Sequence, residues 1–94
     1  MNNIRQVSPD EIPSSYFSSI DVLSNAEEKS ERIRKLLKAV ILSNCEHQDV
    51  GIILKLNNGE VIETFSSLVD YADDFVVIKG GFAIPVKAIV DIEF

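Results

Sequence analysis

Apolar residues follow a helical spacing in the first half of the chain and a strand spacing in the second half. Between residues 24 and 44, apolar side chains recur every three or four positions, which places them on one stripe of an α-helix. The stripe consists of Ile33, Leu36, Leu37, Val40 and Ile41. Ser24 and Glu27 form a capping-box pattern at its beginning, and Asn44 suits its end. The pattern therefore predicts one long helix over residues 24–44.

From residue 50 onward, apolar residues occupy every second position, as in a strand with one buried face. These positions are Val50, Ile52, Leu54 and Leu56. The "NNGE" sequence at residues 57–60 is typical of a tight primed turn, because Asn and Gly tolerate positive φ angles. It predicts a β-hairpin whose second strand covers residues 61–68.

The rest of the chain contains three more short strand patterns, expected over residues 75–78, 82–84 and 88–94. An acidic turn at residues 69–74 and a Gly80-Gly81 turn separate them. Pro85 cannot donate a backbone hydrogen bond, so it belongs at a sheet edge or a strand break. The pattern as a whole predicts an α+β fold that is mainly β. We expect an N-terminal helix followed by a five-stranded, bent antiparallel barrel, with the helix across its open end.

The first 23 residues are expected to be a partly ordered lead to a single domain at residues 24–94. "SPDE" at residues 8–11 has a capping serine and a proline at the first helical position, so it predicts one helical turn. Tyr16, Phe17 and Ile20 follow at helical neighbour spacing. They pack on the domain or form a docking segment for a partner.

Charge and cysteine content narrow the function classes. The 94 residues carry a net charge of −6, which repels free nucleic acid and anionic membranes and disfavours a general phosphate binder. One cysteine allows no internal disulfide framework, and no apolar run approaches the length of a membrane span. We therefore expect a cytoplasmic protein with no membrane partner.

Two stretches of the sequence resemble the motifs of the Sm-like family. "LKLNNGEVIETFSSLVDYADDFVVI" resembles the first Sm motif, with Asp70 eleven residues after Gly59. "DDFVVIKGGFAIPVKAIVDI" resembles the next strand and the second motif, and its close is similar to the end of the RNA chaperone Hfq. The resemblance covers residues 24–94 and implies an Sm-like barrel. Rof-type inhibitors of Rho, which act on a protein, and YolD-like proteins share the same layout.

The sequence also departs from the Sm pattern at the positions that contact RNA. Asp74 stands where Sm proteins have an asparagine that helps to read a base. Val86 and Lys87 stand where Hfq-type proteins have a lysine-histidine pair. The glycine that bends the second Sm strand is missing around residues 64–65. The resemblance therefore implies the fold more strongly than it implies a uridine pocket.

No group of residues has the spacing of a catalytic or metal site. Cys45 and His47 are the only cysteine and histidine, so a four-ligand zinc site lacks its second pair. The aspartates of residues 70–74 do not follow the EF-hand pattern. We expect no cofactor, no metal and no enzymatic activity.

Acidic residues on the barrel surface are the candidate partner-binding residues. They are Glu60, Glu63, Asp70, Asp73 and Asp74. Such a face complements a basic surface, which raises the encounter rate and sets the register of binding. The sequence thus predicts a small regulator or adaptor that binds a protein partner with a basic surface.

The alternative prediction is an oligomeric RNA-binding protein of the Hfq type. Its RNA-facing residues would be Arg32, Lys35, Lys38 and Lys87. Sm-like proteins form rings by pairing edge strands of neighbouring barrels, and Pro85 would blunt one of these edges. A monomer or a dimer is therefore favoured over a ring.

Overall fold

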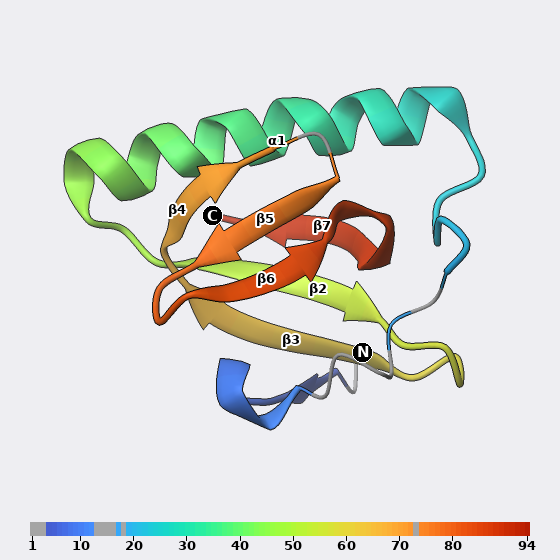
Figure 1. Cartoon of the computed structure of the whole chain (residues 1–94). Coiled ribbons are helices and arrows are strands. Elements are labelled where there is room, and N and C mark those ends of the chain that lie inside the picture. The colour runs from blue at the N-terminus through green and yellow to red at the C-terminus, as the bar shows by residue number, and fades with distance from the viewer. Residues whose placement is uncertain (1–3, 13–16, 18, 73) are drawn as a thin grey trace.

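The computed structural model describes residues 4–12, 17, 19–72 and 74–94 and shows a small α+β protein (Figure 1). Its one long helix, α1 (Ala26–Glu46), lies across two β-sheets. The described residues form seven strands: β1 (Arg5–Gln6), β2 (Val50–Lys55), β3 (Val61–Ser66), β4 (Leu68–Tyr71), β5 (Phe75–Ile78), β6 (Phe82–Pro85) and β7 (Ile89–Glu93). Single 3₁₀ turns occur at Pro9–Glu11 and Val86–Ala88.

The strands form two separate sheets, so the prediction of a five-stranded closed barrel is wrong. The first sheet has the order β1-β3-β2-β7, and the second has the order β4-β5-β6. All neighbouring strands are antiparallel except β1, which pairs in parallel with β3. Within the described ranges, no hydrogen-bonded ladder joins one sheet to the other.

The chain changes sheet at two short interruptions, which explains why the barrel is not formed. At Ser67 the strand pattern predicted for residues 61–68 breaks, because the backbone N–H of Leu68 donates to Ser43 Oγ of α1 at 2.9 Å. β4 then begins at Leu68, the last residue of that predicted strand, and continues to Tyr71, inside the stretch that was predicted to be an acidic turn. At the other interruption, Pro85 ends the edge strand β6, and a 3₁₀ turn separates it from β7.

The helix lies where the apolar pattern predicted it, but its ends differ from the prediction. Asn25, and not Ser24, is the N-cap: its side-chain oxygen accepts hydrogen bonds from the N–H groups of Glu27 and Glu28. The helix continues past Asn44 and ends at His47, which has a left-handed φ of 55°. The N–H of His47 closes the last turn on Ser43 O at 3.1 Å.

The buried side of α1 is not centred on the predicted apolar stripe. The helix residues that are buried are Arg32, Leu36, Ala39 and Ser43. Ile33, Leu37 and Ile41 of the stripe are exposed. The stripe is wider than the surface that the two sheets offer, so one edge of it faces solvent.

The predicted β2–β3 hairpin is confirmed, with a different turn from the expected one. Of residues 57–60, only Gly59 has a positive φ, at 89°, whereas a primed turn has positive φ angles earlier in the loop. The N–H of Gly59 donates to Leu56 O at 2.9 Å, and Leu56 N–H donates to Glu60 O at 2.8 Å. This is a three-residue loop in which glycine takes the left-handed position.

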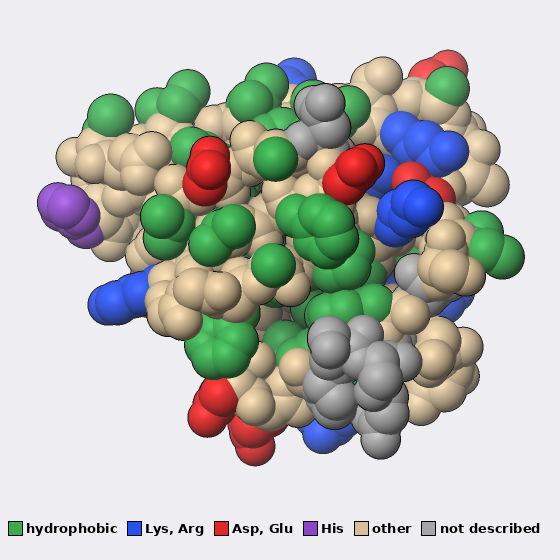
Figure 2. All heavy atoms as spheres, in the orientation of Figure 1, with side chains coloured by type: hydrophobic (Ala, Val, Ile, Leu, Met, Phe, Trp, Pro, Cys, Tyr) green, Lys and Arg blue, Asp and Glu red, His purple; other side chains and the backbone are tan. Residues whose placement is uncertain are grey.

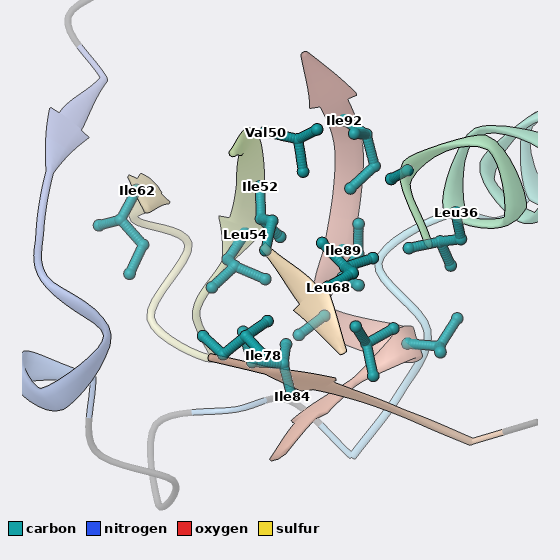
Figure 3. Close-up of a cluster of buried hydrophobic side chains, with 14 of the residues drawn as sticks. Leu36, Val50, Ile52, Leu54, Ile62, Leu68, Ile78, Ile84, Ile89 and Ile92 are labelled. Carbon is teal, nitrogen blue, oxygen red and sulfur yellow. The ribbon is translucent and has the colours of Figure 1, made fainter. Parts of the chain in front are cut away.

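The hydrophobic core lies between the two sheets and beneath α1 (Figure 3). Its fully buried members include Leu36, Ile52, Leu54, Leu68, Val76, Ile78 and Ile89. Val40 and Tyr71 pack against this core while remaining partly accessible. Two sheets and α1, and not a barrel, therefore enclose this core.

The described part of the N-terminal lead is attached to the first sheet. The expected single helical turn is present at Pro9–Glu11, and Ser8 N–H donates to the Glu11 carboxylate at 2.8 Å. Val7 N–H continues the β1 pairing by donating to Glu63 O at 2.9 Å. Phe17 forms an isolated bridge to Leu56, and Tyr16 lies outside the described residues.

Candidate functional site

The predicted acidic face is divided between the two sheets. Glu60 follows the hairpin of the first sheet, and the Arg5 side chain contacts it in an ion pair of 2.9 Å. Glu63 is buried in β3 of the same sheet. Asp70 is exposed on β4, and Asp74 is exposed directly before β5. Asp73 lies outside the described residues. The described candidates therefore form two pairs, with Glu60 and Glu63 at the first sheet and Asp70 and Asp74 at the second.

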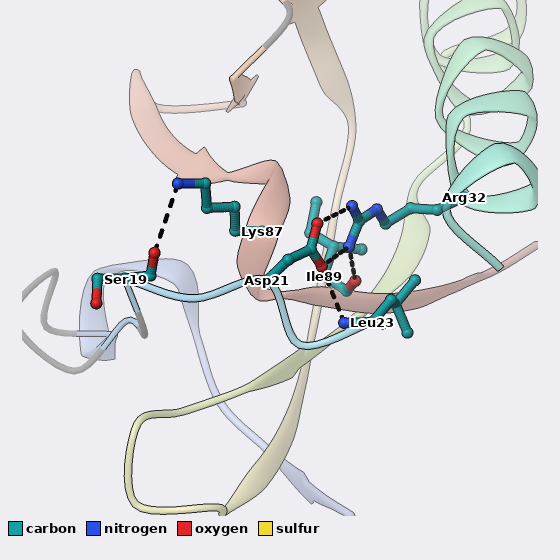
Figure 4. A network of polar contacts seen from close by, with 6 residues as sticks. All are labelled: Ser19, Asp21, Leu23, Arg32, Lys87 and Ile89. Carbon is teal, nitrogen blue, oxygen red and sulfur yellow. Dashed lines mark hydrogen bonds and ion pairs between the residues drawn. The ribbon is translucent and has the colours of Figure 1, made fainter. Parts of the chain in front are cut away.

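Arg32, a candidate RNA-contacting residue, is buried in a polar network (Figure 4). Its two terminal nitrogens donate to the two carboxylate oxygens of Asp21 at 2.9 and 2.7 Å. Nη1 also donates to the backbone carbonyl of Ile89 at 3.0 Å. The Asp21 carboxylate in turn accepts the N–H of Leu23 at 2.9 Å. The guanidinium thus connects the lead, α1 and β7.

The same network changes the acidity of Asp21. The hydrogen bonds from the Arg32 side chain hold the pKa of the Asp21 carboxyl below its usual value, although burial acts in the opposite direction. Bidentate charge-assisted hydrogen bonds favour the ionised carboxylate in this way. Asp21 and Arg32 therefore form a structural ion pair, and the buried guanidinium does not face a ligand at the surface.

The other three predicted basic residues do not form one surface with Arg32. Lys35 donates to Asp91 of β7 at 2.6 Å, and Lys38 lies over the Phe94 ring at 4.5 Å from its centroid. Lys87 is in the 3₁₀ turn Val86–Ala88, and its Nζ donates to Ser19 O at 3.5 Å. Within α1, Glu31 forms an ion pair with Arg34.

One edge of α1 and the outer side of the second sheet form an uncovered apolar surface. We call it the apolar face; its exposed members are Ile33, Leu37 and Ile41 of α1, Val69 of β4 and Phe75 of β5. Leu37 and Ile41 remain 51% and 60% exposed. Figure 2 shows hydrophobic side chains along the helix and over the strands below it, with acidic side chains between them. The acidic positions that border this side are Asp70 and Asp74.

The excessive width of the helical stripe was the sequence signal for this face. Ile33, Leu37 and Ile41 are spaced by four residues, whereas the buried Leu36 and Ala39 form a neighbouring row. A helix that packs on one surface needs only a limited apolar arc. The structure places only part of the wide arc in the core.

Cys45 and His47 do not meet a second group of ligands. Cys45 is exposed, and the left-handed backbone of His47 ends the helix. A shallow cavity of about 410 Å³ near His47 is lined by polar residues that include Asp49, Ser67 and Lys79. In it, Ser67 Oγ donates to the Asp49 carboxylate at 2.8 Å. Among the described residues, no three His, Cys, Asp or Glu side chains are grouped for metal binding.

No helix in the described part of the chain has the length and hydropathy of a membrane span. Comparison of the chain with models of protein families, with curated proteins and with solved structures gives no match.

Proposed function

We propose that this chain is a small non-enzymatic adaptor or regulator that binds a protein partner through its apolar face. The partner presents an apolar strip, which covers α1 and the second sheet, and basic side chains beside it. The observation that carries this proposal is the exposure of large apolar side chains next to Asp70 and Asp74.

The apolar side chains supply the attraction in this proposal. Full burial of a Leu, Ile or Phe side chain stabilises by about 1.5–3 kcal/mol. Leu37, Ile41 and Phe75 are roughly half exposed, so each retains a large part of that free energy for binding. Apolar surface of this kind, bordered by polar groups, is typical of a protein-binding site.

The acidic border supports a partner with basic residues. Neither Asp70 nor Asp74 forms an ion pair within the described ranges. The Asp70 carboxylate accepts a hydrogen bond from the N–H of Tyr71 at 2.8 Å. Together with the net charge of −6, these carboxylates favour encounter with a positively charged surface.

The test begins with identification of the partner by affinity capture and mass spectrometry, followed by calorimetry with the purified partner. We expect Leu37→Asp to weaken binding at least tenfold, because it places a charge at the centre of the apolar contact. The matched control is Ile20→Asp, which changes another exposed apolar residue outside the apolar face. If both variants bind like the wild type, or if both weaken binding equally, this face is not the binding site.

The acidic border is tested separately by Asp70→Lys together with Asp74→Lys. We expect this double variant to slow association several-fold at low salt and to show a smaller salt dependence than the wild type. Glu60→Lys is the matched charge reversal in the first sheet and should leave association nearly unchanged. Because Glu60→Lys changes the net charge by half as much as the double variant, an effect half as large would mean that only net charge matters.

The other expectations about function stay predictions. The RNA-binding alternative required Arg32, Lys35, Lys38 and Lys87 to face one ligand, and the positions of these residues give it no added support. The cytoplasmic location and the preference for a monomer or dimer over a ring are likewise predictions.

A further inference from the structure

Two glutamates approach each other across the central strand of the first sheet. Glu63 of β3 is paired with Ile53 of β2, and Glu93 of β7 is paired with Gly51 of the same strand. Residues 51 and 53 point to the same side of β2, because side chains alternate along a strand. The two acidic side chains therefore lie diagonally on one side of the sheet, with glycine between them.

Gly51 provides the space for this approach. A Cβ atom at Gly51 would lie 2.5 Å from Glu63 Oε2, closer than real Cβ atoms approach an oxygen. The Glu63 carboxyl group thus occupies the volume that a side chain at position 51 would fill. From there it is directed across β2 toward Glu93.

Glu63 is buried and lacks a charged partner. Only 5% of the surface of Glu63 is exposed. Its Oε2 atom has no hydrogen-bond donor within the described residues. Oε1 accepts a long hydrogen bond of 3.4 Å from the neutral Gln6 amide. A buried carboxylate that is both unpaired and incompletely hydrogen-bonded is costly, so the protonated form is favoured.

The neighbouring cations do not neutralise Glu63. Arg5 of β1 is paired with Glu60, and Lys35 of α1 is paired with Asp91 of β7. Lys55, on the same side of β2, forms no ion pair with Glu63. The remaining charged groups nearby are the acids of the first 3₁₀ turn, Asp10 and Glu11, and Glu93 itself.

We propose that Glu63 and Glu93 share one proton above Gly51, and that this proton fastens the C-terminal end of β7 to β3 across β2. We call this arrangement the carboxyl clasp. A protonated carboxyl group donates to a neighbouring carboxylate, which satisfies the otherwise unpaired Oε2. When the proton leaves, two negative charges face each other and the end of the edge strand β7 is repelled from the sheet.

The direction of the pH dependence follows from this geometry. The hydrogen bond to Glu93, burial and the charge of Glu93 all raise the pKa of Glu63 above its ordinary value. A group whose pKa is higher in the folded chain stabilises it fully below the unfolded pKa, and this stabilisation is lost as pH rises through the folded pKa. The clasp is therefore closed in mild acid and released toward higher pH.

NMR titration of the side-chain carboxyl carbons of the full chain tests the clasp. In the wild type, we expect Glu63 to titrate above the normal glutamate range. In Glu93→Gln, its titration should return toward that range, because the neighbouring negative charge is gone.

Amide hydrogen exchange at residues 92–94 is the second test. In the wild type, the exchange rate, corrected for intrinsic pH effects, should increase at least threefold as the pH rises through the titration of Glu63. The acceleration should be absent in Glu63→Gln.

Asp10→Asn is the control, because it removes an exposed acid of the first 3₁₀ turn and leaves the clasp intact. It should keep both the Glu63 titration and the pH-dependent increase in amide exchange.

Normal titration of Glu63 in the wild type would overturn the proposal, as would a pH-independent exchange rate at residues 92–94. A shift of the Glu63 titration by added Ca²⁺ or Mg²⁺ would also overturn it, since the pair would then bind a metal and not a proton. If Glu63→Gln does not fold, the Glu93→Gln titration decides.

Discussion

Arg32 shows how one residue joins three segments that are distant in the sequence. Its side chain is only 5% exposed, and its guanidinium donates to Asp21 and to the carbonyl of Ile89. Breaking a buried pair by removing one partner is expensive, because the remaining charge stays buried without compensation. The pair therefore holds the lead and β7 to α1.

We expect Asp21→Asn to lower the free energy of unfolding by about 3 kcal/mol near neutral pH, measured by urea denaturation. Because the Arg32 hydrogen bonds lower the pKa of Asp21, the stabilisation is present above the unfolded pKa and is lost as pH falls through the folded pKa. The difference between variant and wild type should therefore shrink in acid. Glu31→Gln, which breaks an exposed pair with Arg34, is the control and should change stability little. Equal stability of Asp21→Asn and the wild type would contradict the structural role of the pair.

At the scale of the element, the beginning of α1 depends on a single side chain. Asn25 Oδ1 accepts the N–H groups of Glu27 at 2.7 Å and Glu28 at 3.2 Å, which would otherwise lack partners. Glu27 and Glu28 also place negative charge at the positive end of the helix dipole. The neighbouring Ser24 is exposed and was the predicted cap.

Replacement of these two neighbours distinguishes the observed cap from the predicted one. Asn25→Ala should destabilise the chain by about 1 kcal/mol, because two helical N–H groups lose their acceptor. Ser24→Ala should have a much smaller effect on the same thermal or urea unfolding curve. A larger loss for Ser24→Ala would show that the capping box of residues 24 and 27 operates after all.

For the molecule as a whole, the position of α1 decides which apolar residues belong to the core and which to the apolar face. Leu36 is fully buried against the two sheets, and the adjacent Leu37 is 51% exposed. The two leucines have the same chemistry and the same helix propensity, so their difference is entirely one of tertiary environment.

Alanine substitutions at these two positions test the placement of the helix. Leu36→Ala should lower the free energy of unfolding by about 3 kcal/mol, because it leaves a cavity between α1 and the sheets. Leu37→Ala should change it by less than about 1 kcal/mol. Similar losses at both positions would mean that the helix buries the centre of its apolar stripe.

Local sequence determined the elements whose signals are local. The spacing of apolar residues specified α1 and β2, and Gly59 specified a hairpin because few other residues adopt its backbone conformation. Strands 75–78 and 82–84 were also recognisable, because the Gly80-Gly81 turn separates them. These features depend on residues that are close in the chain.

Tertiary structure decided how the elements pair, because pairing depends on contacts between distant residues. The donation from Leu68 N–H to Ser43 Oγ joins residues 25 positions apart, and it accompanies the break that divides one predicted strand into β3 and β4. Likewise, alternation along β3 and β7 does not specify that Glu63 and Glu93 meet above Gly51; the pairing registers with β2 do. The sequence alone therefore determined the helix, most of the strands and their amphipathic character. The packing of these elements determined the two sheets, the buried Arg32 network and the apolar face. The reason is that the burial of a residue depends on the neighbours that surround it.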